Sequence, residues 1–160
     1  MRFEHERVRI VSAIGARALS VNHIGSTSVP GLAAKPIIDI NLTVADSADE
    51  PAYLAELLAS GYELRVREPD WHEHRMLRTP ARDVHVHVFS AGSTETARNL
   101  LFRDRLRDHP ADRDLYAAEK RELAQEDWPA MQHYADAKTG IVQAIMDRAL
   151  EANAAERPGR

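Results

Sequence analysis

The residues with the clearest potential for chemistry lie in the segment HIGSTSVPGLAAKPIIDINLTV, which runs from His23 to Val44. A Gly-Ser turn exposes backbone N–H groups and a hydroxyl, and both suit the oxygens of a phosphate. A carboxylate on the following strand, that of Asp39, suits a divalent cation. Together they match what a complex of a nucleoside triphosphate with magnesium needs. The candidate phosphate-binding residues are Gly25, Ser26, Thr27, Ser28 and, as a point charge, Lys35.

The segment that carries Asp39 is predicted to be a strand over residues 37–44. Side chains along a strand alternate between the two faces of the sheet. The pattern therefore puts the apolar residues on one face and the polar residues on the other, with Ile38, Ile40, Leu42 and Val44 opposed to Asp39, Asn41 and Thr43. The ordinary alternative is a half-exposed strand whose polar side chains only meet solvent.

A second predicted strand, Asp83–Phe89, carries His85 and His87 on the face opposite its valines. If this strand pairs with residues 37–44 and the faces match, both imidazoles line the same cleft as Asp39. A histidine there could act as a base near neutral pH, bind a metal or contact a phosphate. The alternative is a pair of polar residues on a half-solvated strand.

Three further residues are candidates with simpler explanations. His72 and His74 lie in a predicted loop, EPDWHEH, and could complete a multi-histidine metal site, although loop polarity also explains them. Arg103 lies on a predicted helix. It could neutralise a phosphate, or it could brace that helix through an Arg–Asp pair.

The rest of the pattern predicts the elements that must position these residues. Strands are expected at 21–24, 62–67 and 75–79, and a helix is expected from Asp49 to Gly61 with Tyr53, Leu54, Leu57 and Leu58 facing the core. An opening helix should bury Val8, Val11, Ile14, Ala18 and Leu19. Helices should follow from Glu95 to His109, from Asp112 to Gln125 and from about Asp127. Strands first and helices last predict an α+β fold, with helices packed on the sheet and a helical C-terminal part.

The stretch HIGSTSVPGLAAKPIIDI closely resembles the signature of the GrpB family, also called UPF0157. The resemblance continues through HVHVF and FRDRLRDHP and covers the chain from about Arg7 to Leu150. It implies a nucleotidyltransferase-like mixed sheet, since that superfamily carries Gly-Ser on a loop and Asp-x-Asp or Asp-x-Glu on a strand. Family members also occur fused to dephospho-CoA kinase.

Residue by residue, the resemblance assigns Gly25 and Ser26 to the superfamily loop and Asp39 to its first metal-binding acid. Asn41 stands where the superfamily usually has its second acid, and it offers a neutral carbonyl oxygen in place of a charged one. Two-metal phosphoryl transfer depends on carboxylates that bridge the cations, so Asn41 argues against a polymerase-like two-metal mechanism. Relatives within the family also lack this acid, which points to a different chemistry as the alternative.

Length and composition set the remaining bounds. The 160 residues predict a single domain over residues 1–152 with a flexible tail at 153–160. The formal net charge of −4 gives no general attraction to nucleic acid, which is not expected as a partner. The absence of cysteine excludes disulfides, thiolate catalysis and cysteine-based zinc sites. No signal-type or membrane-spanning apolar run is visible, so a cytoplasmic protein without a membrane partner is expected.

Two classes of function remain. The first is a metal-dependent, nucleotidyltransferase-like enzyme that transfers a nucleotidyl group from a nucleoside triphosphate to a small-molecule or other acceptor. The Gly-Ser turn would hold the triphosphate, Asp39 and Asn41 would hold Mg²⁺ or Mn²⁺, and His85 or His87 would activate the acceptor or hold the second substrate. The second class is a non-catalytic nucleotide- or phosphate-binding module. A metal-dependent hydrolase built on the same acid and histidines is a third hypothesis.

Overall fold

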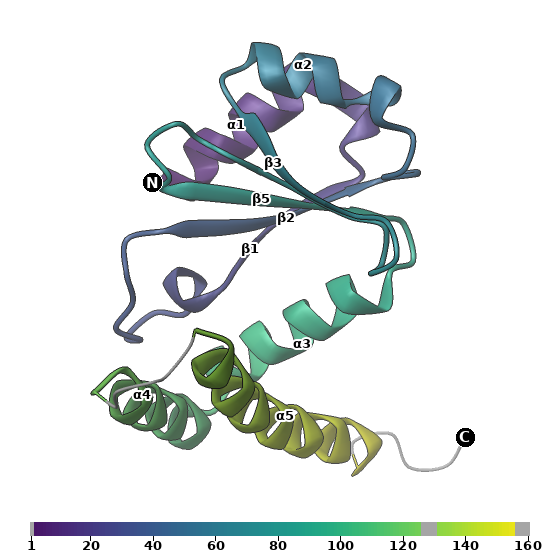
Figure 1. The fold of residues 1–160 in the computed structure, drawn as a ribbon. Helices are drawn as coiled ribbons and strands as arrows, with labels where there is room; N and C mark the ends of the chain where they lie inside the picture. The colour runs from purple at the N-terminus through teal and green to yellow at the C-terminus, as the bar shows by residue number, and fades with distance from the viewer. Residues whose placement is uncertain (1, 126–130, 156–160) are drawn as a thin grey trace. The chain divides into compact units, whose positions relative to one another are not determined.

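Five strands form one mixed sheet in the computed structural model, which describes residues 2–125 and 131–155 (Figure 1). The strand order is β1-β2-β5-β4-β3. Strands β2 and β5 are parallel, and the other neighbouring pairs are antiparallel. The bounds are β1 (Ser20–Ile24), β2 (Ile38–Val44), β3 (Glu63–Glu68), β4 (His74–Arg78) and β5 (Val84–Ser90).

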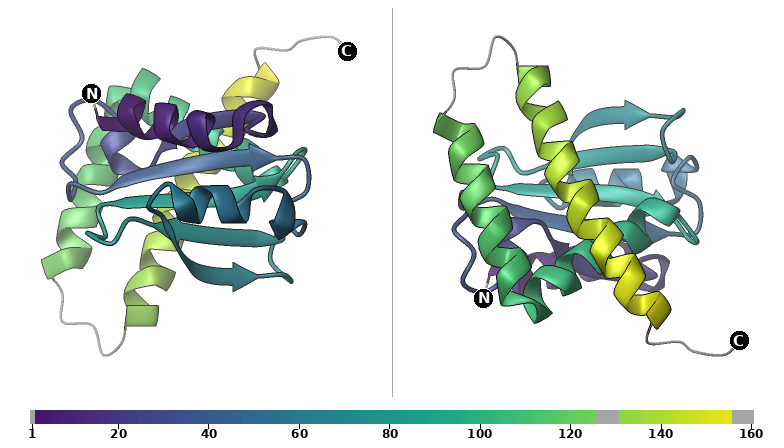
Figure 2. Two further views of the ribbon diagram at one scale, coloured as in Figure 1. Left: turned by 90° about the horizontal axis from the view of Figure 1, so that it is seen from above. Right: turned by 90° about the horizontal axis from the view of Figure 1, so that it is seen from below.

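Helices α1 (Arg2–Ile14) and α2 (Leu54–Ala59) cover the apolar face of this sheet (Figures 1 and 2). Their buried side chains pack against the alternating isoleucines, leucines and valines of the two central strands, including Ile40, Leu42, Val86 and Val88. The period-two pattern of β2 and β5 therefore fixes which face is covered by α1 and α2. It also leaves the polar residues of both strands together on the other face.

The register of the parallel pair decides which polar residues become neighbours. Asp39 is paired with His85 across the β2–β5 ladder, and Asn41 is paired with His87. Between β1 and β2 a short 3₁₀ helix, η2 (Ser26–Ser28), follows directly after the last residue of β1 and Gly25. The turn and the acid-bearing strand thus belong to one local unit.

The chain divides into two compact units, of which the first contains residues 1–28 and 34–99 and so holds the whole sheet. The second contains residues 29–33 and 100–160, with most of α3 (Thr94–Asp108), all of α4 (Pro110–Gln125) and, within its described part, α5 (Met131–Ala155). Helices α4 and α5 run side by side (Figure 2). A separate apolar core holds this unit together, formed by Val29, Leu32, Leu106, Tyr116 and Ile145.

The predicted α+β fold is confirmed, as is the helical C-terminal part. The prediction of a single domain over residues 1–152 stays a prediction. Residues 126–130, where the last helix was expected to begin, and residues 156–160 of the expected tail lie outside the described residues. Among the helices that the structure describes, none combines the length and hydropathy that a membrane crossing requires.

The predicted buried face of the opening helix is partly wrong. Helix α1 already begins at Arg2, and its buried stripe is Glu6, Ile10 and Ile14, three positions spaced by four. Val8, Val11 and Leu19, which were expected to be buried, are exposed. A glutamate can take part in the stripe because the hydroxyl of Tyr62 donates a hydrogen bond to its carboxylate.

The predicted helix from Asp49 to Gly61 is shorter than expected. A 3₁₀ turn, η3 (Glu50–Ala52), precedes α2, and Gly61 ends the segment with a φ of +111°. Tyr53 and Leu57 are buried as expected, whereas Leu58 is exposed. The short helix has only about two turns, so it presents one narrow stripe to the sheet.

Candidate functional site

Two imidazoles on the polar face of the sheet approach one carboxylate oxygen of Asp39. The Oδ1 atom of Asp39 lies 3.5 Å from Nε2 of His87 and 3.6 Å from Nδ1 of His85. The three side chains are between 27% and 30% exposed, so a ligand could reach each of them. The structure thus brings the three predicted catalytic residues together on one face, and their catalytic roles stay predictions.

Gly25 lies directly against this carboxylate. Its φ is +75°, a conformation that glycine adopts readily and other residues avoid. A Cβ atom built on Gly25 would lie only 2.7 Å from Oδ2 of Asp39. The contact explains the need for glycine at this position in two independent ways, and it places the predicted phosphate-binding turn beside the predicted metal-binding acid.

Two hydroxyls of the turn are used to hold the turn itself. The hydroxyl of Thr27 donates to the carbonyl of Ile37 at 3.0 Å and lies 2.9 Å from Nε2 of His23. The hydroxyl of Ser28 donates to the carbonyl of Gly25 at 2.5 Å. The Thr27 bond fastens the turn to the residue before β2, and the Ser28 bond closes the turn on itself. The phosphate-binding roles of the turn residues stay a prediction.

Asn41 is fully buried on the same strand face as Asp39. Neither its carbonyl oxygen nor its amide nitrogen has a hydrogen-bond partner among the described residues. A buried polar group without a partner costs about 1–3 kcal/mol, so most such groups in native proteins are paired. The amide therefore offers an unused acceptor and an unused donor next to the cluster around Asp39.

His74 belongs to this site, and the prediction that it lies in a loop is wrong. It is the first residue of β4 and is buried. Its Nε2 lies 2.9 Å from Nδ1 of His87, and its Nδ1 lies 2.8 Å from Oε1 of Glu68. Glu68 is the last residue of β3 and pairs with His74 in the antiparallel ladder. Sequence reasoning missed Glu68 because the strand pairing across the hairpin was not visible in it.

Aromatic rings hold the imidazole of His74 in place. The ring of Phe89 stacks on it with centroids 5.0 Å apart, and Trp71 meets it edge-on at 5.2 Å. Burial lowers the pKa of His74, and the lowering effect exceeds the opposing effect of the hydrogen bond with Glu68. The lowered pKa favours the neutral imidazole, which carries a single N–H.

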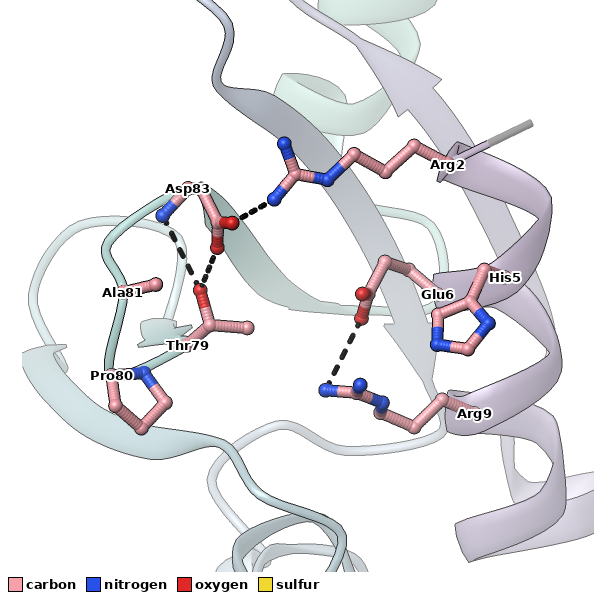
Figure 3. Close-up of a pocket in the computed structure, with 8 residues that line it drawn as sticks. All are labelled: Arg2, His5, Glu6, Arg9, Thr79, Pro80, Ala81 and Asp83. Atoms are coloured by element: carbon pink, nitrogen blue, oxygen red, sulfur yellow. Dashed lines mark hydrogen bonds and ion pairs between the residues drawn. The ribbon is translucent and has the colours of Figure 1, made fainter.

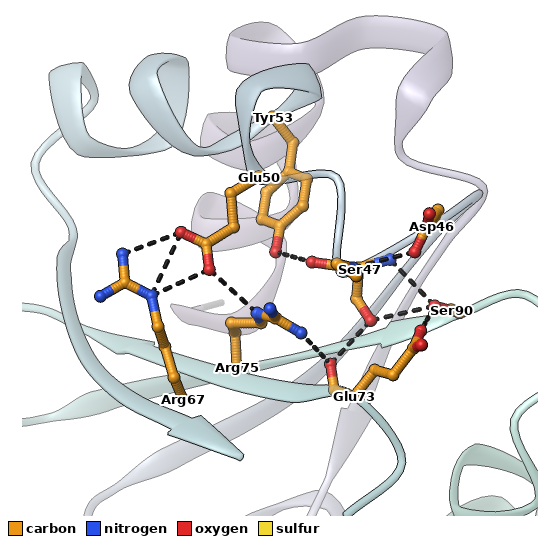
Figure 4. A network of polar contacts seen from close by, with 9 residues as sticks. Asp46, Ser47, Glu50, Tyr53, Arg67, Glu73, Arg75 and Ser90 are labelled. Carbon is orange, nitrogen blue, oxygen red and sulfur yellow. Dashed lines mark hydrogen bonds and ion pairs between the residues drawn. The ribbon is translucent and has the colours of Figure 1, made fainter. Parts of the chain in front are cut away.

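A polar network fixes the hairpin that carries His74 (Figure 4). The hydroxyl of Ser47 donates to the carbonyl of Glu73 at 2.7 Å, and the guanidinium of Arg75 donates to the same carbonyl at 2.8 Å. Arg75 also bonds Glu50, which forms a second ion pair with Arg67. This network ties the β3–β4 turn to the segment after β2, so the histidine is held by a rigid element.

Two of the remaining predicted residues of the first unit, His72 and Lys35, are not part of this cluster. His72 lies in the β3–β4 turn with a φ of +53°, and its Nε2 is 3.9 Å from Oε2 of Glu95. Lys35 is exposed in the stretch before β2. Arg103 belongs to the second unit, where it pairs with Asp104 at 2.9 Å. Across the described residues, no three histidine, aspartate or glutamate side chains already surround one point in the manner of a metal centre.

A cavity of about 660 Å³ lies elsewhere in the first unit, between α1 and the turn that joins β4 to β5 (Figure 3). Its charged groups pair with one another, Arg2 with Asp83 and Arg9 with Glu6 at 3.7 Å. These ion pairs occupy the groups that would otherwise recognise a charged ligand. We therefore place the candidate site at Asp39 and not in this cavity.

Comparison with known proteins agrees with this architecture. UPF0157 protein BH1888 of Halalkalibacterium halodurans is 58% identical over 147 residues, which cover 92% of this chain and 75% of that protein. The crystal structure of conserved protein GrpB from Enterococcus faecalis matches with a TM-score of 0.81 and 35% identity, covering 95% of this chain and 92% of that one. A dephospho-CoA kinase of Mycolicibacterium paratuberculosis is 34% identical over 143 residues, covering 73% of this chain and 35% of that protein.

A more distant match is the Cid1 poly(U) polymerase, in the structure of its H336N mutant bound to MgATP. The TM-score is 0.44 at 17% identity, covering 75% of this chain and 41% of that one, which is too low to bear on function. The profile of the family described as GrpB protein matches residues 1–148. On the strength of this match and of the close relatives, the chain belongs to the GrpB family.

Proposed function

We propose that this protein is a metal-dependent, nucleotidyltransferase-like enzyme that acts at the cluster around Asp39. The observation that carries the proposal is the direct contact between Gly25 and the Asp39 carboxylate. It brings a turn suited to phosphate next to an acid suited to a cation, and two imidazoles lie within 3.6 Å of the same acid.

Each residue of the site has a distinct task in this proposal. The turn Gly25–Ser28 contacts the phosphates of a nucleoside triphosphate. Asp39 binds the cation through its carboxylate, and the buried carbonyl of Asn41 is the second oxygen available to it. His85 or His87 accepts the proton of an acceptor hydroxyl, or orients the acceptor.

The residues present fit a divalent cation of the Mg²⁺ or Mn²⁺ kind. Asp39 supplies a charged oxygen, and Asn41 supplies a buried carbonyl that lacks a partner among the described residues. When bound, such a cation would offset the negative charge of the phosphates at the reacting centre. The site offers one acid where a two-metal centre needs more, so the proposal involves a single metal.

A binding module without catalysis is the second candidate. The observation that favours it is Asn41 itself, because the missing second acid would leave nucleotide binding intact and remove transfer. The two candidates differ in one result. An enzyme turns over in the presence of an acceptor, and a binding module only binds.

The test combines calorimetry with a turnover assay. Nucleoside triphosphates are titrated with and without Mg²⁺ or Mn²⁺, and pyrophosphate release is followed with a panel of acceptors. Dephospho-CoA belongs in the panel because relatives that share this region carry the name dephospho-CoA kinase. Asp39→Asn should abolish metal-dependent binding and turnover together.

The matched control is Asp49→Asn, because Asp49 is exposed and its side chain makes no capping hydrogen bond. This variant should behave as the wild type. Binding without pyrophosphate release by any acceptor would favour the binding module. Nucleotide binding that is unchanged in Asp39→Asn would overturn the metal-dependent enzyme, and an absence of nucleotide binding with or without a metal would overturn both candidates.

A further inference from the structure

A chain of contacts crosses four strands of the sheet and ends at the candidate site. Glu68 on β3 lies 2.8 Å from His74 on β4, and His74 lies 2.9 Å from His87 on β5. His87 in turn lies 3.5 Å from Asp39 on β2. The chain therefore has a carboxylate at each end, two imidazoles between them and three links.

The N–H hydrogens available to this series of contacts number one fewer than its three links. An ionised carboxylate only accepts hydrogen bonds, and a neutral imidazole carries one N–H and one lone pair. Glu68 therefore takes the Nδ1–H of His74. This leaves Nε2 of His74 as an acceptor, so the link to His87 needs the Nδ1–H of His87. With both imidazoles neutral, Nε2 of His87 has no hydrogen left for Asp39.

The third link, between Nε2 of His87 and Oδ1 of Asp39, therefore joins two atoms that both carry lone pairs. Such atoms repel each other unless a positive charge lies between them. This link is the longest of the three, at 3.5 Å against 2.8 and 2.9 Å. Two ligand atoms about 2.1 Å from a tetrahedral metal ion are about 3.4 Å apart, so the gap has the width of a metal-bridged pair. Nδ1 of His85, at 3.6 Å from the same oxygen, lies at a similar distance.

We propose that Glu68 and His74 are positioning residues that hold His87 as its Nδ1–H tautomer, so that Nε2 of His87 and Oδ1 of Asp39 together bind a divalent transition-metal ion. An imidazole ligand selects such an ion over Mg²⁺, which prefers oxygen. Outer partners of this kind fix the tautomer and orientation of a metal-binding histidine. The inference rests on the proposed function only for the use of the cation. Within that function it limits the cation to Mn²⁺ or another transition-metal ion, and it assigns the proton-accepting role to His85, because a metal-bound His87 has no lone pair left.

The first test reads the tautomer in the metal-free protein. Nitrogen-15 NMR of labelled histidines at pH 8 should show His87 protonated at Nδ1 and unprotonated at Nε2. His74→Phe removes the acceptor, and the tautomer should then shift toward Nε2–H. If His87 of the wild type carries its proton on Nε2, or carries protons on both nitrogens, the proposal is overturned.

The second test measures metal binding, with Zn²⁺ as the probe and Mg²⁺ for comparison. Zn²⁺ should shift the Nε2 signal of His87, and Mg²⁺ at the same concentration should not. Loss of an outer partner typically weakens metal binding about 10- to 100-fold, and we expect Glu68→Ala to fall in this range. Glu68→Gln keeps an oxygen acceptor for His74 and should restore most of the affinity.

Glu63→Ala is the matched control, since Glu63 is an exposed glutamate at the other end of the same strand. It should leave Zn²⁺ affinity and the tautomer unchanged. Equal Zn²⁺ affinity in wild type, Glu68→Ala and His74→Phe, with all three folded by their amide spectra, would overturn the proposal. Zn²⁺ binding at His87 without any nucleotidyl transfer would instead refute only the proposed function, which keeps the two failures distinct.

Discussion

Gly25 and Asp39 are so close that the glycine has no room for a side chain. Gly25→Ala should therefore displace the carboxylate and also strain the backbone, which has a φ of +75°. The strain alone costs about 1–2 kcal/mol. We expect lower stability in urea unfolding and loss of nucleotide and metal binding in calorimetry.

Gly92→Ala separates the backbone strain from the steric contact with Asp39. Gly92 has a φ of +81°, but a Cβ built on it meets nothing within 4 Å. This variant should show a similar loss of stability and normal ligand binding. If Gly25→Ala binds ligands as well as Gly92→Ala does, the contact with Asp39 has no part in binding.

A further variant at the site, Asn41→Asp, replaces the neutral amide with a carboxylate and so restores the acid pair of the superfamily. The new carboxylate would be fully buried on the same strand face as Asp39, and two like charges so placed disfavour each other. We expect lower stability and no gain in pyrophosphate release with any divalent metal. A clear gain in transfer would show that Asn41 weakens an otherwise ordinary two-metal reaction.

At the scale of elements, the strands could be predicted more accurately than the buried faces of the helices. Apolar alternation at 37–44 and 83–89 gave the two central strands to within one residue, because a strand with one buried face must alternate. Helix α1 buries Glu6 and exposes Val8, since the partner that satisfies Glu6 is a distant tyrosine. Such a partner leaves no local mark in the sequence.

The β3–β4 hairpin gives a prediction at this scale, because it carries both Glu68 and His74. Hydrogen bonds from Arg67 and, second, from Arg75 hold the pKa of Glu50 below its usual range. Glu50→Gln removes the negative charge that pairs the largely buried Arg75. A charge-assisted bond of this kind is worth about 1.5–3 kcal/mol. We expect a loss of that order in urea unfolding, and faster hydrogen exchange in β4.

Glu4→Gln is the comparison for that variant, since the Glu4–Arg7 pair is exposed on both sides. Exposed pairs contribute about 0–1 kcal/mol. Equal losses in the two variants would mean that the Glu50 network does not hold the hairpin.

At the scale of the whole molecule, the division into two units was beyond sequence reasoning. Residues 29–33 lie between β1 and η2 on one side and β2 on the other, yet they belong to the helical unit. Val29 and Leu32 are buried there with Tyr116 and Ile145, which are far away along the chain. Short-range periodicity carries no information about such pairings. The same limit hid the contact of His74 with His87.

Within the helical unit, a cluster of ion pairs around Asp112 makes the free energy of unfolding depend on pH in the acid range. Asp112 on α4 accepts hydrogen bonds from Arg105 on α3 at 2.7 Å and from Arg148 on α5 at 2.6 Å. Burial raises the pKa of Asp112, but the bonds from Arg148 and Arg105 outweigh it, so the pKa lies below its usual value. The folded state thus binds this proton more weakly than the unfolded chain does.

It follows that Asp112 stabilises the helical unit above the unfolded pKa of about 4, and that this contribution is lost as the pH falls through the lower folded value. Asp112→Asn should cost about 2–3 kcal/mol at pH 7 and less at pH 3, measured by urea unfolding followed by circular dichroism. Asp114→Asn removes an exposed acid from the same helix and should change little at either pH. A loss of equal size at pH 7 and pH 3 in Asp112→Asn would show that the carboxylate acts by its shape and not by its charge.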